Sequence, residues 1–177
     1  MEAFKTDKYY TIDDIYALPE GERAELIDGR MYSMAAPSRE HQRLSMLLSR
    51  EISNYIKSNG GNCEVYAAPF AVFLKKDDRT YVEPDISVVC DPEKLNDKGC
   101  SGAPDWIIEI VSESSRYMDY MRKLLLYQAS EVKEYWIVDP EKRMVIKYDF
   151  HHETSDQFSF GEKVPAGIYE DFGVVVE

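Results

Sequence analysis

Hydrophobic positions recur along this chain with two periods, that of a helix and that of a strand. The longest helical pattern begins after Pro37, with Ser38 as its N-cap, and ends at Asn59-Gly60-Gly61. Its apolar stripe consists of Leu44, Leu47, Leu48, Ile52, Tyr55 and Ile56. The opposite face carries Arg39, Arg43, Arg50 and Lys57, which favours a solvated surface, with a phosphate-contacting surface as the alternative.

Shorter patterns flank this helix. Thr11 is the expected N-cap of a short helix ending before Pro19, and Asp28-Gly29 is the expected turn of a hairpin over 23–34. After the long helix we expect three strands and then a polar loop over 91–102. The three strands are Cys63–Ala67, Phe70–Leu74 and Tyr81–Cys90.

The segment 106–138 carries the pattern of a strand, a helix and a second strand. The strands are Asp105–Val111 and Glu134–Val138, and the helix is capped by Ser114 or Ser115 and ends near Ser130. We expect Met118, Met121, Leu124 and Leu125 on its buried face. Arg143–Tyr148 completes a hairpin, and the tail holds a final strand, Gly173–Val176. The pattern predicts one α/β domain over 1–177, a mixed sheet flanked by helices with N-terminal and C-terminal hairpins.

Charge and cysteine content narrow the classes of function. There are 33 acidic and 21 basic residues, a net charge of −12, so any binding of DNA must be local and assisted by metal ions. The three cysteines form no CxxC pair, which predicts reduced thiols rather than a disulfide framework or a zinc site. No apolar run approaches a membrane span, so we expect a cytoplasmic protein without membrane contact.

The sequence lacks the motifs of several common enzyme classes. The chain has no glycine-rich phosphate loop, GxSxG or HExxH, so we expect no nucleotide cofactor and no serine or zinc hydrolysis.

The remaining candidate for chemistry is a pair of acidic residues. Asp85 follows Pro84 within a strand-like segment, and Glu109 interrupts the most apolar strand. These two carboxylates could hold a divalent cation together with the Ile110 carbonyl; alternatively, they are turn and strand-end residues.

The helix that follows carries a polar side formed by Arg116, Asp119, Lys123 and Tyr127. An ordinary Asp119–Lys123 pair one helical turn apart is one interpretation. In the other, Lys123 reaches back over the end of the Glu109 strand and supplies the positive charge that phosphodiester cleavage requires.

These residues resemble a known family. Glu83-Pro84-Asp85-Ile86-Ser87-Val88-Val89 and Pro104-Asp105-Trp106-Ile107-Ile108-Glu109-Ile110-Val111-Ser112 are similar to motifs II and III of the PD-(D/E)XK nuclease superfamily. The branch of "putative restriction endonucleases", formerly a domain of unknown function, shares the further series that ends in Glu134-Tyr135-Trp136-Ile137-Val138-Asp139-Pro140. Ala24-Glu25-Leu26-Ile27-Asp28-Gly29 and His41 extend the match, which covers roughly residues 10 to 150.

The resemblance implies a restriction-endonuclease-like core of four or five strands and cleavage of DNA that depends on Mg²⁺ or Mn²⁺. Asp85, Glu109 and the Ile110 carbonyl would hold the metal, and the products would be a 5′-phosphate and a 3′-hydroxyl. The superfamily places its lysine two residues after the acid, where this chain has Val111. In this branch Lys123, on the following helix, is the matching position.

The resemblance also adds residues and rival functions. Glu25 matches an acid of the branch and is either a further metal or water ligand or a surface strand residue. His41 is either a core histidine or a hydrogen-bonding residue of the site; Asp119 and Tyr127 are further candidates. A homodimer is expected because duplex cleavage involves two strands. The rivals are a catalytically degenerate protein that binds nucleic acid or protein, and an interaction protein whose acids are structural.

Overall fold

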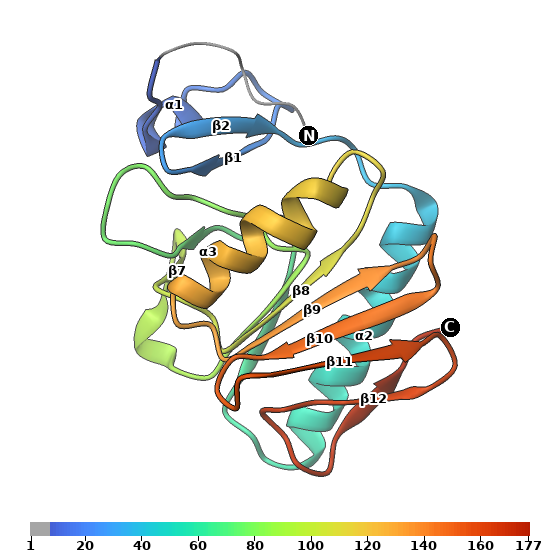
Figure 1. The fold of residues 1–177 in the computed structure, drawn as a ribbon. Helices are drawn as coiled ribbons and strands as arrows, with labels where there is room; N and C mark the ends of the chain where they lie inside the picture. Colours follow the sequence, from blue (N-terminus) through green and yellow to red (C-terminus); the bar gives the residue numbers. More distant parts are fainter. Residues whose placement is uncertain (1–7) are drawn as a thin grey trace.

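The structure is a computed structural model that describes residues 8–177; positions 1–7 of the predicted domain lie outside the described residues. Its centre is a six-stranded sheet in the order β11-β10-β9-β8-β5-β3 (Figure 1). Strands β8 and β9 are parallel, and every other neighbouring pair in this sheet is antiparallel. The strands are β3 (Glu64–Ala67), β5 (Ile86–Val89), β8 (Trp106–Ile110), β9 (Glu134–Asp139), β10 (Met144–Asp149) and β11 (Thr154–Ser159). The predicted mixed α/β fold is confirmed.

Helices cover both faces of the sheet because the central strands are apolar on both sides. In β8, Trp106, Ile108 and Ile110 pack in one core with the long helix α2 (Arg39–Ser58). Ile107 belongs to a second core with the helical segment formed by η2 (Met118–Lys123) and α3 (Leu124–Ala129). Figure 1 shows α2 behind the sheet and α3 in front of it. Successive strand residues point to opposite faces, which assigns Glu109 to the α3 side.

The N-terminal hairpin lies at one end of this sandwich. It pairs β1 (Ala24–Ile27) with β2 (Arg30–Ser33) and follows the short helix α1 (Ile12–Tyr16). Asp28 and Gly29 both have positive φ, 48° and 78°, as a tight two-residue hairpin turn requires. An antiparallel bridge from Leu26 to Tyr81 attaches the hairpin to the rest of the molecule. The predicted hairpin and its turn are therefore confirmed.

Small elements complete the fold and correct several predicted strands. The third predicted strand, Tyr81–Cys90, is regular only over Ile86–Val89, since Pro84 donates no ladder hydrogen bond. The predicted loop over 91–102 contains the short helix η1 (Pro92–Lys94) and the strands β6 (Leu95–Asn96) and β7 (Gly99–Ser101). These two strands form a small sheet with β4 (Val72–Phe73). In the tail, β12 (Lys163–Pro165) pairs with β13 (Gly173–Val175).

The expected four- or five-stranded sheet is wrong by one strand. The additional strand is β11, whose residues are mostly exposed and polar. It pairs with β10 along its whole length but buries no apolar face, so it lacks the alternating pattern that reveals a strand in a sequence.

The predicted buried face of the second helix is also partly wrong. Met118 is buried, but Met121 and Leu125 are 52% and 62% exposed. The cause is η2, a π-helical segment whose wider turn takes up one additional residue. The buried pair Met118 and Asp119 therefore recurs at Leu126 and Tyr127, eight residues later rather than seven. The π turn rotates Asp119, Lys123 and Tyr127 inward.

The cysteines contradict the expectation of reduced thiols. Cys63 and Cys90 are joined by a disulfide bond, and Cys100 is free and buried. The two bonded cysteines stand next to Glu64 and Val89, which face each other in the β3–β5 ladder. Strand pairing brings them together, a relationship that their spacing of 27 residues does not reveal.

Candidate active site

Asp85 and Glu109 meet at the end of two neighbouring strands. Strand β5 pairs with β8 so that Ile86 faces Ile108, and the same register carried one residue further places Asp85 opposite Glu109. The backbone N–H of Asp85 points at Oε2 of Glu109, 3.5 Å away. The register therefore brings together the two acids that the sequence singled out.

Asp85 is held in place from two sides. Its Oδ2 accepts a hydrogen bond of 2.7 Å from the backbone N–H of Ile110 and lies 3.0 Å from Nε2 of His41 on α2. Burial disfavours a charged His41, but the Asp85 carboxylate outweighs it and raises the pKa of the imidazole. Of the two interpretations of His41, the structure shows the hydrogen bond within the site.

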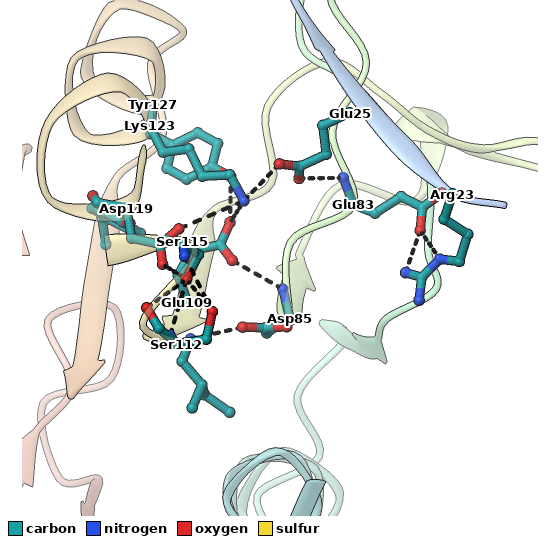
Figure 2. Close-up of polar contacts among 12 residues, drawn as sticks. Arg23, Glu25, Glu83, Asp85, Glu109, Ser112, Ser115, Asp119, Lys123 and Tyr127 are labelled. Atoms are coloured by element: carbon teal, nitrogen blue, oxygen red, sulfur yellow. Dashed lines mark hydrogen bonds and ion pairs between the residues drawn. The ribbon is translucent and has the colours of Figure 1, made fainter. Parts of the chain in front are cut away.

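Lys123 lies among three carboxylates. Its Nζ is 2.9 Å from Oε1 of Glu109, 2.9 Å from Oε2 of Glu25 and 3.8 Å from Oδ1 of Asp119. Figure 2 shows Lys123 and Glu25 meeting from opposite sides of this cluster. All four side chains are almost fully buried. We call Glu25, Glu109, Asp119 and Lys123 the carboxylate cage.

Burial and charge set the protonation states in the cage. Burial raises the pKa of Glu109 well above its ordinary value, although Lys123 opposes the shift. Burial also raises the pKa of Asp119, to about 7, again against Lys123. For Lys123, burial acts against the charge, but Glu109, Glu25 and Asp119 outweigh it and raise the pKa of the ammonium group. Lys123 is therefore a fixed positive charge rather than a base.

The remaining partners orient the cage. The Tyr127 hydroxyl donates to Oε1 of Glu109 at 2.6 Å, and burial raises the pKa of this phenol well above its ordinary value, so it remains a donor. Ser115 donates to Oδ2 of Asp119 at 2.6 Å, whereas Oδ1 of Asp119 is buried without a hydrogen-bond partner. One oxygen of Asp119 is thus hydrogen-bonded, and the other faces Lys123 without a hydrogen bond.

Glu25 is a buried strand residue rather than a surface one. It is fully buried, and its Oε1 accepts a hydrogen bond of 3.0 Å from the backbone N–H of Glu83 while Oε2 faces Lys123. The structure contradicts the interpretation of Glu25 as a surface strand residue. Its contacts tie the N-terminal hairpin to Lys123, and direct contact with a metal ion stays a prediction.

The site opens into a cavity of about 640 Å³. Its lining comes from the β2–α2 connection and the start of α2, from the segment between β4 and β5, from the end of β8, and from the segment that leads into η2. Lining residues of the site are His41, Asp85, Glu109, Ile110, Asp119 and Lys123. All the predicted site residues except the buried Glu25 and Tyr127 therefore reach one space.

The chemistry of this lining fits a hard divalent cation. Asp85 Oδ1 has no hydrogen-bond partner among residues 8–177. The Asp85 backbone N–H lies 3.5 Å from Oε2 of Glu109, so the two acids are neighbours. The Val111 N–H donates to Val138 on β9, so strand alternation directs the Ile110 carbonyl to the opposite edge, where Asp85 lies. In the described part of the chain, no three His, Cys, Asp or Glu side chains form a complete ligand set. A metal would use two carboxylates, the Ile110 carbonyl and water, a set that suits Mg²⁺.

Arg23 and Glu83 also line the cavity, and sequence reasoning gave neither of them a role at the site. Arg23 donates to Oε2 of Glu83 through Nε at 2.9 Å and through Nη2, and the two side chains lie beside Glu25 in Figure 2. A signal for Arg23 exists in its spacing from Glu25, because residues two apart in a strand point to the same face.

The fold and site define the class of protein. A mixed sheet that presents Asp85 and Glu109 on adjacent strands, with Lys123 against the glutamate, is the arrangement of restriction-endonuclease-like nucleases. Residues 8–165 match the model of the Uma2 family, described as "Putative restriction endonuclease". The chain belongs to this family.

Individual proteins are similar to this chain in fold or in sequence. The crystal structure of "a putative nuclease belonging to DUF820" from Anabaena variabilis ATCC 29413 has a TM-score of 0.75 and 20% sequence identity, over 93% of this chain and 94% of that one. Two "uncharacterized" proteins of Synechocystis sp. also match. One, slr1290, is 27% identical over 76% of this chain and 68% of its own length; the other, sll1609, is 25% identical over 67% of each.

Within residues 8–177, no helix has the length and apolar character needed to cross a membrane.

Proposed function

We propose that this protein is an endonuclease that hydrolyses phosphodiester bonds of DNA with the help of Mg²⁺ or Mn²⁺, and that it acts as a homodimer. Family membership supports a nuclease, and the metal, the DNA substrate and the dimer are the proposed extensions. The observation that carries the proposal is the excess of acid around Lys123. Glu25, Glu109 and Asp119 share one buried ammonium group, and the Asp85 backbone lies against Glu109. The acids at the site therefore outnumber its buried cation, which favours binding of a further cation.

Asp85, Glu109 and the Ile110 carbonyl would hold the metal ion. When bound, Mg²⁺ polarises the scissile phosphate and lowers the pKa of a water molecule. The protein's own contribution is to keep both ligands in place. His41 and the Ile110 N–H hold Asp85, while Tyr127 and Lys123 hold Glu109. Such partners of the ligands commonly set metal affinity.

Lys123 has a second part in this scheme. It lines the cavity, and its neighbours keep it protonated, so it offsets the negative charge that develops on the phosphate during attack by water. It does not remove a proton from that water. Placed on the helix after β8, it occupies the side of Glu109 that the lysine two residues after the acid would reach in the superfamily pattern.

The first test is calorimetric titration of Mg²⁺ and Mn²⁺ into the wild type and an Asp85→Ala variant. We expect binding to the wild type and none to the variant, because a ligand has been removed. Glu113→Gln is the matched control, since Glu113 is an exposed acid on the rim of the same cavity. Equal binding to wild type and Asp85→Ala would place the metal elsewhere.

The second test is cleavage of plasmid and of short labelled duplexes in Mg²⁺ or Mn²⁺. We expect the wild type to cut both, and Asp85→Ala and Glu109→Ala to be inactive yet folded. Metal binding that depends on Asp85, combined with DNA binding and no cleavage under any condition, would favour the catalytically degenerate alternative. Sedimentation analysis, with and without DNA, tests the homodimer.

A further inference from the structure

The positive groups of the cavity are few, although its proposed substrate is a polyanion. Of the described residues that line it, Arg23 and Lys123 are the ones that carry a permanent positive charge. The Lys123 side chain is 3% exposed and surrounded by the carboxylate cage, whereas the Arg23 side chain is 35% exposed. Arg23 is therefore the more exposed of the two permanent cations that a phosphate meets in the cavity, while Lys123 acts on it from within the carboxylate cage.

Arg23 is held with its outer face available. Its Nε and Nη2 both donate to the same oxygen of Glu83, Oε2. Glu83 is itself fixed, because its Oε1 accepts a hydrogen bond of 2.6 Å from the Tyr81 hydroxyl. Nη1 of Arg23 has no partner among residues 8–177, so three of the five guanidinium N–H groups remain unengaged.

The backbone places Arg23 beside the site but not at its centre. The Met34 N–H donates to the Arg23 carbonyl, which extends the β1–β2 ladder by one pair. Arg23 therefore points to the same face of the hairpin as Glu25. In Figure 2, Arg23 lies on the far side of Glu83 from Lys123 and Glu109. A phosphate bound to Arg23 is thus a neighbour of the phosphate that reaches Asp85 and Glu109.

We propose that Arg23 is a phosphate-binding residue that contacts the nucleic-acid backbone next to the scissile phosphate. The inference rests on the proposed function, since it assigns a contact of the same substrate. Glu83 orients the guanidinium group so that its free edge presents parallel N–H donors, the geometry that pairs with two phosphate oxygens. Arg23 contributes to substrate binding and not to bond cleavage.

A purely structural role is the competing explanation, because the Arg23–Glu83 pair also joins the hairpin to the segment before β5. The two roles differ in salt dependence. Each phosphate contact releases counterions and adds about 0.9 to the slope of log affinity against log salt. A structural pair contributes nothing to this slope beyond any unfolding.

The experiment measures binding of a fluorescent DNA duplex of mixed sequence, by anisotropy, from about 50 to about 200 mM NaCl. Ca²⁺ replaces Mg²⁺, and gel analysis verifies that the duplex stays intact. The proteins are wild type, Arg23→Gln and Arg50→Gln. Arg50 is a matched control: it donates through Nε and Nη2 to one oxygen of Glu51, as Arg23 does to Glu83, but on an exposed face of α2.

We expect Arg23→Gln to bind about tenfold more weakly at low salt and to lose about 0.9 of the slope. Over the fourfold salt range, the wild type then loses about 3.5-fold more affinity than the variant. In cleavage assays KM should rise while kcat stays near the wild-type value. Arg50→Gln should keep the wild-type slope, and thermal unfolding checks that each variant is folded.

Each outcome decides between the explanations. Wild-type binding combined with an unchanged slope in Arg23→Gln overturns the role of Arg23 and leaves the proposed function intact. An equal loss of slope in Arg50→Gln also overturns it, because the effect is then one of general charge. A wild type that neither binds nor cuts DNA with any metal overturns the proposed function, and the assignment of Arg23 with it.

Discussion

Glu25 and Lys123 face each other at 2.9 Å, one on the N-terminal hairpin and the other at the end of the π-helical segment. Both are almost fully buried, so their charges are paired out of contact with water. The hairpin, an appendage in the ribbon of Figure 1, therefore supplies a wall of the carboxylate cage. This contact therefore contributes both to the stability of the fold and to the structure of the site.

Removal of the ammonium group should destabilise the protein strongly. We expect Lys123→Met to lower the free energy of unfolding by about 3–5 kcal/mol, because Glu25, Glu109 and Asp119 lose their shared buried cation. Urea denaturation in EDTA measures the change. Lys57→Met, at an exposed position of α2, is the control and should change the value by less than about 0.5 kcal/mol. A wild-type midpoint for Lys123→Met would contradict the cage as described.

The raised pKa of Asp119 predicts a pH-dependent contribution to stability. The folded protein holds a proton on Asp119 up to about pH 7, whereas the ordinary pKa is 3.8. The folded state binds more protons between these values, so this contribution is complete below about pH 4 and is lost as pH rises through about 7. The stability of wild type relative to Asp119→Asn should therefore fall across this range. Denaturation of both proteins in EDTA at several pH values measures it, and a constant difference would count against the shift.

The π turn determines which residues of the helical segment face solvent, and this predicts which substitutions there change stability. Met121→Gln and Leu125→Gln should each change stability by less than about 0.5 kcal/mol, because both side chains are mostly exposed. Leu126→Ala should cost about 2–5 kcal/mol, because Leu126 is buried in the second core. Chemical denaturation of the three variants distinguishes this phase from a regular α-helix, for which Leu125 would be the costly position.

The disulfide predicts the number of reactive thiols. In denaturant without a reductant, a thiol titration should detect one group per chain, that of Cys100, and after reduction it should detect all three cysteines. Protein purified under air without reductant is the sample, and a Cys63→Ser variant is the control, which should show two thiols before reduction. Three thiols in the unreduced wild type would contradict the disulfide bond and agree with the reduced cysteines that the sequence predicted.

Local patterns in the sequence were sufficient to predict the core of the fold and part of the site. Strand alternation and an acid within an apolar run were sufficient to single out Glu109, and Pro84 marked the neighbouring Asp85. The helical spacing of Asp119, Lys123 and Tyr127 showed that they share one side. That the shared side is buried could not be seen, because a polar stripe normally faces solvent and the π turn leaves no signature in hydrophobic period.

What the sequence could not provide depends on contacts between distant segments. Glu25 reaches Lys123, and Cys63 reaches Cys90, only through the arrangement of the hairpin and the sheet. Strand β11 is stabilised by its backbone ladder with β10 rather than by an apolar face, so its side chains do not report it. Arg23 belongs to none of the sequence motifs, and its place at the site follows from the cavity that the folded chain forms.

The carboxylate cage is assembled from parts of the chain that are synthesised far apart in time. Glu25 emerges from the ribosome early, Glu109 much later, and Lys123 last, and strand β9 must then follow to seat the helix against the sheet. Domains generally fold as whole units, and such long-range contacts form late. A chain that stops before β9 therefore carries no complete site. For the nuclease proposed above, products of translation that is interrupted before β9 would lack the complete site and would not cut the DNA of the cell that makes them.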